Sequence, residues 1–141
     1  NTFLIYKFRT MVKDAVHQGL GTTVAAADAR ITRVGGWLRA WSLDELPQLM
    51  NIVKGDMSLV GPRPTFAYQV AQYSPFQRRR LEVKPGVTGW AQINQGHVTE
   101  TDAMRAKLEY DLYYLKHCSL WLDLVIVLRT FAVVAGGTGA R

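Results

Sequence analysis

The stretch Ser42-Leu43-Asp44-Glu45-Leu46-Pro47-Gln48 decides how this chain is interpreted. A serine followed three residues later by a glutamate matches the capping box that opens a helix, and apolar residues continue at helical spacing after it. Because proline fits the first position of a helix but not the fifth, either the helix begins at Pro47 or its first turn is distorted. Both alternatives place two adjacent carboxylates, Asp44 and Glu45, at a helix N-terminus, and we expect Gly55 to end the helix.

The rest of the chain predicts mostly helix with a little strand. Residues 2–11 alternate as a strand does, which places Lys7 and Arg9 on one face, and residues 14–30 are small and polar, typical of a loop. In the first half of the chain we also expect a short helix or turn in 31–41 and a rigid loop at 58–64. In the second half we expect helix over 66–82 interrupted near Pro75, turns with a short strand in 84–96, a helix from a Thr99 cap to about His117, and a last helix capped by Ser119 and ended by Gly136-Gly137. We therefore expect an α+β, mostly helical fold: a small compact domain with short strands and amphipathic or apolar interfacial helices.

The composition is that of an ordinary globular chain with a basic surface. With 141 residues, 48% of them hydrophobic and 20% charged, the chain is long enough for a core, and we treat residues 1–141 as a single domain. Its 17 Lys and Arg against 11 Asp and Glu give a net charge of +6, which favours anionic partners. Nucleic acid, anionic lipid and phosphorylated small molecules all remain open, because the sign of the charge does not choose among them.

The single cysteine and the most apolar segment exclude some classes of protein. Cys118 cannot form an intramolecular disulfide, and we expect a buried or semi-buried thiol rather than a nucleophile. Leu120–Ala135 carries Asp123 and Arg129 and would be about 24 Å long as a helix, short of a hydrocarbon core of about 30 Å. It should therefore lie in a membrane interface or in the core and not span. The histidines lack metal-ligand spacing and are interpreted as non-catalytic: His17, His97 and His117.

Adjacent carboxylates such as Asp44 and Glu45 suit a particular kind of chemistry. On a helix they point about 100° apart, so they do not share a proton as the pair in an aspartic protease does. They suit a division of labour, in which one attacks phosphorus or holds a metal while the other shapes the site. The alternative is that both only stabilise the helix dipole from its first turn.

Basic residues supply candidate phosphate ligands. Arg63 stands between Pro62 and Pro64, so its backbone is fixed and its side chain can hold a phosphate through two bonds at little entropic cost. The alternative is a structural arginine that binds carbonyl groups or a carboxylate. Lys7 and Arg9 are two cations on one strand face, and a solvated edge strand is the alternative for them.

Other charged residues have simpler explanations. Arg78-Arg79-Arg80 is interpreted as a solvated helical surface or a contact with anionic lipid headgroups. Asp111 follows Lys107 by four residues, which predicts a surface ion pair, and Glu109 pairs in the same way with Arg105. The sequence contains no P-loop, dinucleotide-binding fingerprint, Ser/His/Asp arrangement or recognisable nucleic-acid-binding module.

Six segments, taken in order, carry more information than any one of them. They are YKFRTM (6–11), ITRVG (31–35), SLDELPQ (42–48), KGDMSLVGPRP (54–64), KPGVTGWAQ (84–92) and KLEYDLYY (107–114). In this order they resemble the bacterial sugar transferase family, the monotopic polyprenyl-phosphate phosphoglycosyl transferases, along nearly the whole chain. The resemblance favours the catalytic interpretation of Asp44 and Glu45 over the helix-dipole alternative.

The resemblance implies a reaction. A UDP-sugar would give its sugar 1-phosphate to a polyprenyl phosphate such as undecaprenyl phosphate and release UMP, the first step toward an exopolysaccharide, capsule, O-antigen or protein glycan. Asp44 would attack the β-phosphate and form a covalent phosphosugar intermediate, and Mg²⁺ would be held by Asp44 and Glu45. The residues expected to bind substrate and phosphate are Arg63, Lys7, Arg9, Lys84 and Asp111.

The resemblance also implies a location and one departure. The family acts at the cytoplasmic face of the bacterial inner membrane, so the inner-leaflet surface is an expected partner and nucleic acid is not. The family carries an apolar re-entrant helix before the Tyr-Lys-Phe-Arg segment, which here begins at Tyr6. We therefore expect residues 1–141 to be the C-terminal catalytic part of a longer protein. The alternative function is a non-catalytic membrane-surface scaffolding module.

Overall fold

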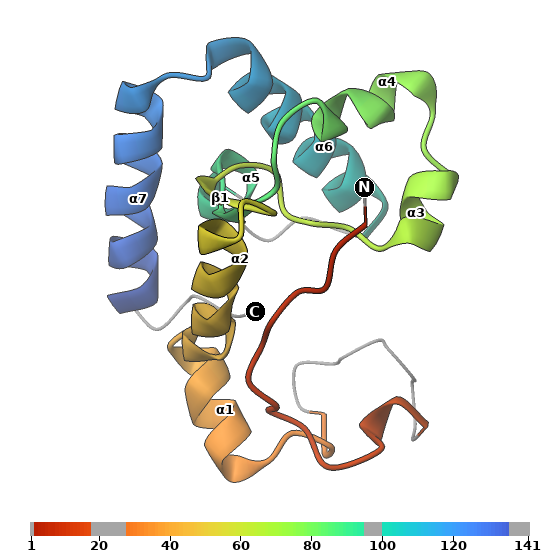
Figure 1. The fold of residues 1–141 in the computed structure, drawn as a ribbon, viewed down its shortest axis with the longest axis vertical. Coiled ribbons are helices and arrows are strands. Elements are labelled where there is room, and N and C mark those ends of the chain that lie inside the picture. Colours follow the sequence, from red (N-terminus) through yellow and green to blue (C-terminus); the bar gives the residue numbers. More distant parts are fainter. Residues whose placement is uncertain (1, 18–27, 95–99, 136–141) are drawn as a thin grey trace.

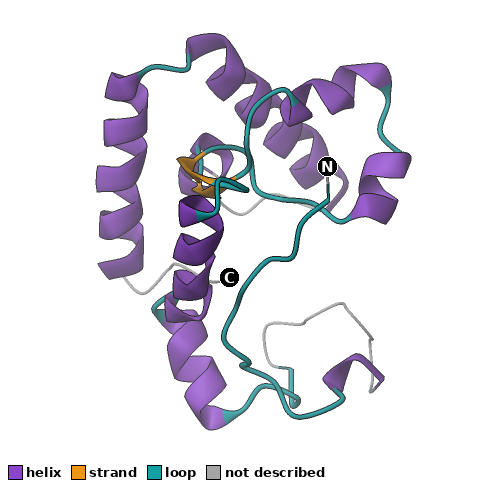
Figure 2. Cartoon of the chain, in the orientation of Figure 1, coloured by secondary structure: helices purple, strands orange, loops and turns teal. Residues whose placement is uncertain are grey.

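The computed structural model describes residues 2–17, 28–94 and 100–135, arranged as Figure 1 shows. In chain order the elements are η1 (Ala15–His17), α1 (Arg33–Ala40), η2 (Leu43–Gln48), α2 (Leu49–Val53), β1 (Ser58–Val60), α3 (Ala67–Ala71), α4 (Pro75–Arg78), η3 (Arg79–Leu81), β2 (Gly86–Thr88), α5 (Trp90–Asn94), α6 (Glu100–His117) and α7 (Leu120–Ala135). The η elements are 3₁₀ helices. Helix predominates over strand in the described chain (Figure 2), which confirms the α+β, mostly helical fold class.

The two strands form a small parallel sheet inside the helical shell. β1 pairs with β2 so that Val60 lies opposite Thr88. Parallel strands are usually buried by helices, and α7 packs against both strands here. α5 packs against both α6 and α7. Val60, Tyr114 and Ile126 form the centre of the core. The core thus draws on β1, α6 and α7 and lies away from the extended N-terminal segment (Figure 1).

The N-terminal segment is extended but is not a strand, so the strand predicted over residues 2–11 is wrong. Within the described ranges its only strand-like contact is an isolated antiparallel bridge at Met11. Elsewhere its backbone binds other partners: the N–H of Tyr6 donates to the side chain of Asn51, and the N–H of Phe8 donates to a carbonyl group in η2. The alternating pattern predicted an extended backbone correctly, but none of the residues that the structure describes forms a neighbouring strand beside the segment to make a ladder.

The capping box predicted at Ser42 does not form. Ser42 has a φ of +53°, in the left-handed region, and its side chain makes no cap hydrogen bond. The chain turns there from α1 into η2, and the α-helix begins only at Leu49. Pro47 explains the tight turn, because it has no N–H to donate to the carbonyl four residues back. The alternative of a distorted first turn is therefore the correct one, and Asp44 and Glu45 lie in that turn.

Glycines mark the end of α2 and the close approach of the two strands. Gly55, with a φ of +81°, ends α2 as expected. The rigid loop predicted at 58–64 is wrong in its first half, because residues 58–60 form β1. The backbones at Gly61 and Gly86 approach so closely that a Cβ on either residue would collide with the other segment. Glycine at both positions is thus what allows the two short segments to pair.

The helices of the second half follow the sequence pattern. The helix predicted over 66–82 is interrupted near Pro75 and gives α3, α4 and η3. The hydroxyl of Ser119 accepts a hydrogen bond from the N–H of Leu122, which confirms the predicted cap of α7. Of the loop predicted at 14–30, residues 15–17 form η1 and residues 18–27 lie outside the described residues, as do the predicted Thr99 cap and the Gly136-Gly137 stop. None of the helices in the described ranges has the length and apolar character needed to cross a membrane.

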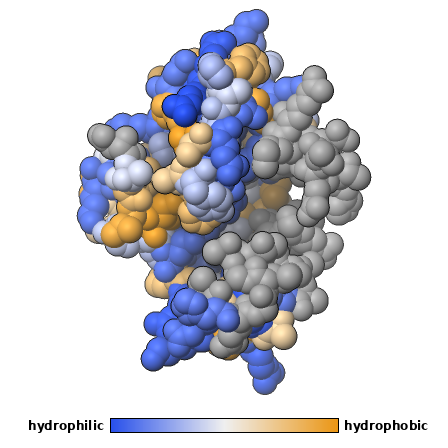
Figure 3. All heavy atoms as spheres, turned by 90° about the vertical axis from the view of Figure 1, so that its right-hand side faces the viewer, coloured by the Kyte–Doolittle hydropathy of each residue, from blue (hydrophilic) through white to orange (hydrophobic). Residues whose placement is uncertain are grey.

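The surface mixes hydrophilic and hydrophobic side chains. Figure 3 shows the side that lies at the right of Figure 1, where hydrophilic residues predominate and smaller hydrophobic patches interrupt them. α7 has two faces, because Ile126 is fully buried whereas Leu120, Trp121 and Phe131 are 89%, 73% and 69% exposed. The segment predicted to lie in an interface or in the core therefore contributes to the core on one face and offers apolar side chains to solvent on another.

Candidate active site

Three segments that are distant in the sequence meet at Glu45. Its Oε1 accepts a hydrogen bond of 2.6 Å from Lys7 Nζ in the N-terminal segment and one of 2.8 Å from Arg63 Nη2 in the loop after β1. The side chain of Glu45 is 18% exposed, and those of Lys7 and Arg63 are 41% and 45% exposed. The two cations are thus fixed beside each other and remain accessible, as a site for an anionic ligand requires.

Asp44 precedes Glu45 in the chain, and the electrostatic surroundings of its carboxyl differ from those of Glu45. Burial raises the pKa of the Asp44 carboxyl above its ordinary value, and the charge of Glu45 raises it further. Lys7 and Arg39 oppose these two effects. Within the described ranges no ion pair engages Asp44, whereas Glu45 is engaged by two cations. The two carboxylates therefore differ in their surroundings: two cations bind Glu45, whereas Asp44 is in no ion pair with a described residue.

Asn51, which the sequence analysis did not single out, fixes the segment that carries Lys7. It is fully buried, its Oδ1 accepts a hydrogen bond of 3.1 Å from the N–H of Tyr6, and its Nδ2 donates one of 2.7 Å to the carbonyl of Leu4. A helix thereby binds an extended backbone as a neighbouring strand would. The signal was present in the sequence, since an asparagine inside a helix is unfavourable unless its amide has a purpose.

Arg80 and Asp111 form a buried ion pair, which corrects two predictions. The solvated surface predicted for Arg78-Arg79-Arg80 is wrong for Arg80, whose side chain is 7% exposed, although the other two are exposed. The surface pair predicted between Asp111 and Lys107 is also wrong, because Asp111 is 2% exposed and its Oδ2 lies 2.7 Å from Arg80 Nη2. The packing explains both: α6 lies against η3, and only the third arginine of the run faces it.

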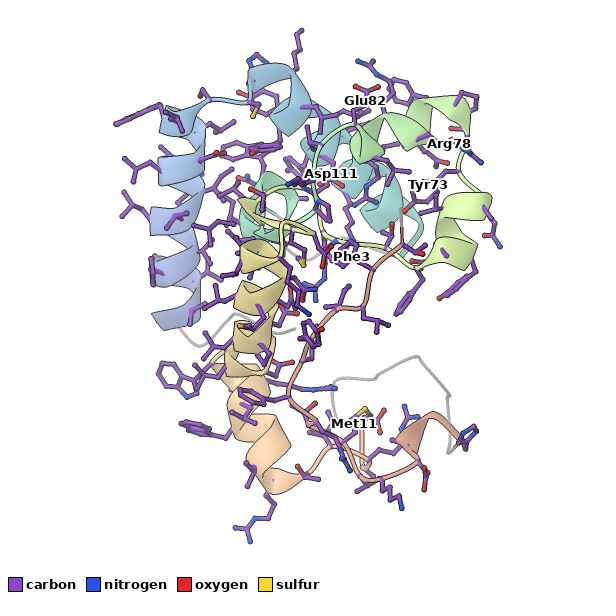
Figure 4. The ribbon with its side chains drawn as sticks, in the orientation of Figure 1. Phe3, Met11, Tyr73, Arg78, Glu82 and Asp111 are labelled. Carbon is purple, nitrogen blue, oxygen red and sulfur yellow. The ribbon has the colours of Figure 1, made fainter. Side chains whose placement is uncertain are left out.

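The surroundings of this pair place Asp111 in the interior rather than in the surface cluster. Figure 4 labels it on α6, with Tyr73 on the turn between α3 and α4. The contact with Arg80 is an ion pair without hydrogen-bond geometry, since Asp111 Oδ2 has no hydrogen-bond partner. Burial raises the pKa of Asp111 and lowers that of Lys107. The predicted pair of Glu109 with Arg105 involves a side chain outside the described ones.

Two of the predicted phosphate ligands do not join the cluster. Arg9 is exposed and forms no ion pair with any residue that the structure describes. Lys84 is also exposed, and its Nζ lies beside Gly55 at the end of α2. Of the four cations that the sequence nominated, the structure therefore brings Lys7 and Arg63 to Glu45 and leaves the other two apart.

Cys118 and two of the three histidines lie in the described part of the chain, and none of these three residues belongs to the cluster at Glu45. Cys118 is exposed, so the prediction of a buried or semi-buried thiol is wrong; it sits where α6 gives way to α7. The ring of His117 packs against Tyr113, and His17 is exposed. His97 falls outside the described residues.

The donor set at Asp44 and Glu45 fits magnesium. No group of three or more His, Cys, Asp or Glu side chains in the described part of the chain could hold a metal by itself. Magnesium does not need one, because it keeps several waters and is commonly bound by one or two carboxylates together with substrate phosphates. The raised pKa of Asp44 marks a carboxylate whose ionised form a cation would stabilise. The residues thus fit Mg²⁺ bound together with a phosphorylated substrate.

Comparison with known proteins assigns the family. The sequence model of the bacterial sugar transferase family matches residues 1–137. The chain belongs to this family. The UDP-N-acetylgalactosamine-undecaprenyl-phosphate N-acetylgalactosaminephosphotransferase of Aeromonas hydrophila is 46% identical over 99% of this chain and 33% of its own length. The UDP-glucose:undecaprenyl-phosphate glucose-1-phosphate transferase of Xanthomonas campestris pv. campestris is 44% identical over 95% of this chain and 29% of its own length.

A third relative shows how much of the length of such proteins the chain covers. The UDP-glucose:undecaprenyl-phosphate glucose-1-phosphate transferase of Escherichia coli (strain K12) is 42% identical over 89% of this chain and 28% of its own length. The chain thus spans about a third of the length of these relatives. The resemblance inferred from six short segments is confirmed along nearly the whole chain.

Proposed function

We propose that this chain is the catalytic domain of a phosphoglycosyl transferase, which moves a sugar 1-phosphate from a UDP-sugar to a polyprenyl phosphate and releases UMP. The observation that supports it most directly is the cluster in which Lys7 and Arg63 bind Glu45 beside an available Asp44, in a chain of the bacterial sugar transferase family. The names of the relatives supply the substrate classes, since each pairs a UDP-sugar with undecaprenyl phosphate.

The first step is attack by Asp44 on the β-phosphorus of the UDP-sugar. A carboxylate oxygen of Asp44 forms the new bond to phosphorus, and the bond from that phosphorus to the bridging oxygen breaks. The electron pair leaves on that oxygen, which becomes part of UMP. The sugar 1-phosphate is then held on Asp44 as an acyl phosphate. Partial burial, the main cause of the raised pKa of Asp44, leaves less water to shield the attacking carboxylate.

Cations are needed because every participant is an anion. A carboxylate, a diphosphate and a lipid phosphate repel one another strongly in a partly dry site. Lys7 and Arg63 stand within hydrogen-bond distance of Glu45 and can turn their remaining N–H groups to phosphate oxygens. Asp44 and Glu45 would hold Mg²⁺, which supplies charge neutralisation at the phosphate oxygens and the leaving UMP when it is bound.

The second step returns the enzyme to its starting state. A phosphate oxygen of the polyprenyl phosphate attacks the phosphorus of the acyl phosphate, and the carboxylate of Asp44 leaves with its electron pair. The product is a polyprenyl-diphosphate sugar. Covalent transfer in two steps lets one set of cations serve two bulky substrates in turn, after UMP has left the site.

The acceptor requires the site to reach a membrane. A polyprenyl phosphate carries its phosphate at a membrane surface, which for a nucleotide-sugar donor is the cytoplasmic face of the bacterial inner membrane. The net charge of +6 favours an anionic leaflet, and the exposed apolar side chains of α7 can enter the interface. Both features support a domain that works at the inner leaflet.

A transfer assay tests the proposal. The full-length protein is incubated with a panel of UDP-sugars, undecaprenyl phosphate and Mg²⁺, and UMP release is measured. We expect release that depends on all three components and that Asp44→Asn abolishes. Arg9→Gln is the matched control, because Arg9 is a neighbouring cation outside the cluster. Full activity of Asp44→Asn would remove Asp44 as the nucleophile, and absence of release with every UDP-sugar would remove the proposed reaction.

A non-catalytic scaffolding module at the membrane surface is the second candidate. The exposed apolar face of α7 and the positive net charge favour it. Binding of the full-length protein to anionic vesicles without any UMP release would support it. The intact cluster at Glu45 is the feature that this candidate leaves unexplained, since a scaffold has no use for two accessible cations fixed beside two carboxylates.

A further inference from the structure

The loop that presents Arg63 is bound to the sheet on one side only. The N–H of Gly61 donates to the carbonyl of Thr88 at 2.9 Å, and the N–H of Gly86 donates to the carbonyl of Pro62 at 3.0 Å. Beyond Pro62 the chain leaves β2 and runs to α3 (Figure 1). Whatever fixes the backbone of Arg63 itself must therefore come from elsewhere in the domain.

Arg80 provides that contact. Its Nη2 donates a hydrogen bond of 3.1 Å to the carbonyl oxygen of Arg63, and its Nη1 donates one of 3.1 Å to the hydroxyl of Tyr73. The same Nη2 lies 2.7 Å from Asp111 Oδ2. A planar guanidinium with several N–H groups can make such contacts at once, whereas a lysine ammonium has less reach and no fixed plane.

Burial makes this arrangement rigid. The side chain of Arg80 is 7% exposed and that of Asp111 is 2% exposed, so water cannot replace either partner at low cost. Asp111 belongs to α6, an 18-residue helix that packs against α5 and η3. The carbonyl of Arg63 is thus tied to the longest helix of the described chain through one buried arginine.

We propose that Arg80 and Asp111 are positioning residues that hold the backbone of Arg63 so that its guanidinium reaches Glu45 beside Asp44. The line of contacts runs from Asp111 through Arg80 to the Arg63 carbonyl, and from Arg63 Nη2 to Glu45 Oε1 at 2.8 Å. In this assignment neither member of the buried pair contacts substrate, in keeping with side chains that are 7% and 2% exposed. This inference rests on the proposed function, because it assigns the pair a task in phosphosugar transfer beyond joining α6 to η3.

The simple alternative is a buried ion pair that only stabilises the packing of α6. A double-mutant cycle with Arg63 separates the two roles. The variant Arg80→Met with Asp111→Leu removes both buried charges and refills their volume, a change that usually leaves stability unchanged or raised. We expect its melting temperature to stay within the range of Arg79→Met, the exposed control on the same 3₁₀ helix. We expect kcat to fall about 100-fold, the scale of an ångström-sized misplacement of a catalytic group.

The same two substitutions are then made in an Arg63→Ala background. If they act through Arg63, the further loss of kcat there should be less than about threefold, because the group they position is already gone. A full 100-fold further loss, or a normal kcat in the wild-type background, would overturn the proposal. Should the charge-free variant fail to fold, Arg80→Lys replaces it. It keeps the ion pair but not the bond to the Arg63 carbonyl, and it should lower kcat by about tenfold without a change in KM for the UDP-sugar.

Hydrogen exchange keeps the test separate from the proposed function. In the charge-free variant, exchange at the Gly61 and Gly86 amides, whose hydrogen bonds hold the start of this loop, should rise at least about tenfold above wild type and above Arg79→Met, measured by mass spectrometry on peptides covering 59–68 and 84–90. If the wild type releases no UMP but this rise occurs, the proposed function fails while the positioning of the loop stands. If the exchange is unchanged, the positioning fails whatever the activity.

Discussion

Replacing Glu45 with glutamine should damage activity far more than stability. Glu45→Gln keeps the shape of the side chain but removes the charge that binds Lys7 at 2.6 Å and Arg63 at 2.8 Å. Both cations are more than 40% exposed, so each contact stabilises the fold by only about 0.2–1 kcal/mol. For a domain of this size, a total near 1 kcal/mol lowers the melting temperature by about 3–4 °C.

The cost to catalysis is larger because two cations lose their fixed positions. A charge-assisted hydrogen bond to a developing phosphoryl charge contributes about 1.5–3 kcal/mol, and each 1.36 kcal/mol is a factor of ten in rate. Two such contacts together amount to about 3–6 kcal/mol, so we expect kcat to fall about 10²- to 10⁴-fold. The loss of the Glu45 charge also removes one cause of the raised pKa of Asp44, so the acid limb of the activity profile should move to lower pH.

The assay is UMP release by the full-length protein over a range of pH, with Glu82→Gln as control. Glu82 is an exposed carboxylate whose ion pair with Arg79 is 3.7 Å long, and its replacement should leave rate, profile and melting temperature unchanged. A loss of less than threefold in kcat for Glu45→Gln, or an acid limb that stays in place, would refute the reasoning that Glu45 organises the cations and tunes Asp44.

Three further substitutions test other parts of the account. The raised pKa of Asp44 means that folding favours the protonated carboxyl, so Asp44→Asn should raise the melting temperature at pH 7. Calorimetry should show this gain disappear as the pH falls below 3.8, the ordinary pKa of an aspartate, because Asp44 is then protonated in both the folded and the unfolded state. Asn51→Leu leaves the N–H of Tyr6 and the carbonyl of Leu4 without their partner and should cost about 2–4 kcal/mol in urea unfolding; a loss under 0.5 kcal/mol would contradict its anchoring role. Lys7→Gln should lower kcat at least about tenfold while Arg9→Gln changes it less than twofold, and equal effects would show that the cluster is not the phosphate site.

The sequence predicted the elements better than their contacts. Proline and glycine restrict the backbone locally, which is why the interruption near Pro75 and the helix end at Gly55 were correctly placed. The strand over residues 2–11 and the capping box at Ser42 failed for a shared reason. Each depends on a partner, a neighbouring strand or an α-helical first turn, that local pattern cannot show to be present.

The same distinction holds for the site, where residue types could be predicted but their contacts could not. Asp44, Glu45, Lys7 and Arg63 could be nominated from residue type and motif order, and the structure brings the last three together. The burial of Arg80 could not be predicted, because three consecutive arginines look alike until the packing of α6 selects one of them. The surface position predicted for Asp111 was wrong for the same reason, since spacing along one helix says nothing about a partner on another element.

Mass spectrometry of the protein after incubation with UDP-sugars tests the central claim most directly. The full-length protein is incubated with Mg²⁺ and each UDP-sugar in the absence of undecaprenyl phosphate, quenched, digested and searched for a phosphosugar adduct. We expect one adduct, on the peptide that contains Asp44, formed together with an equal amount of UMP and lost when undecaprenyl phosphate is added. It should be absent from Asp44→Asn. An adduct on any other residue, or UMP release without an adduct under conditions that preserve acyl phosphates, would contradict the account.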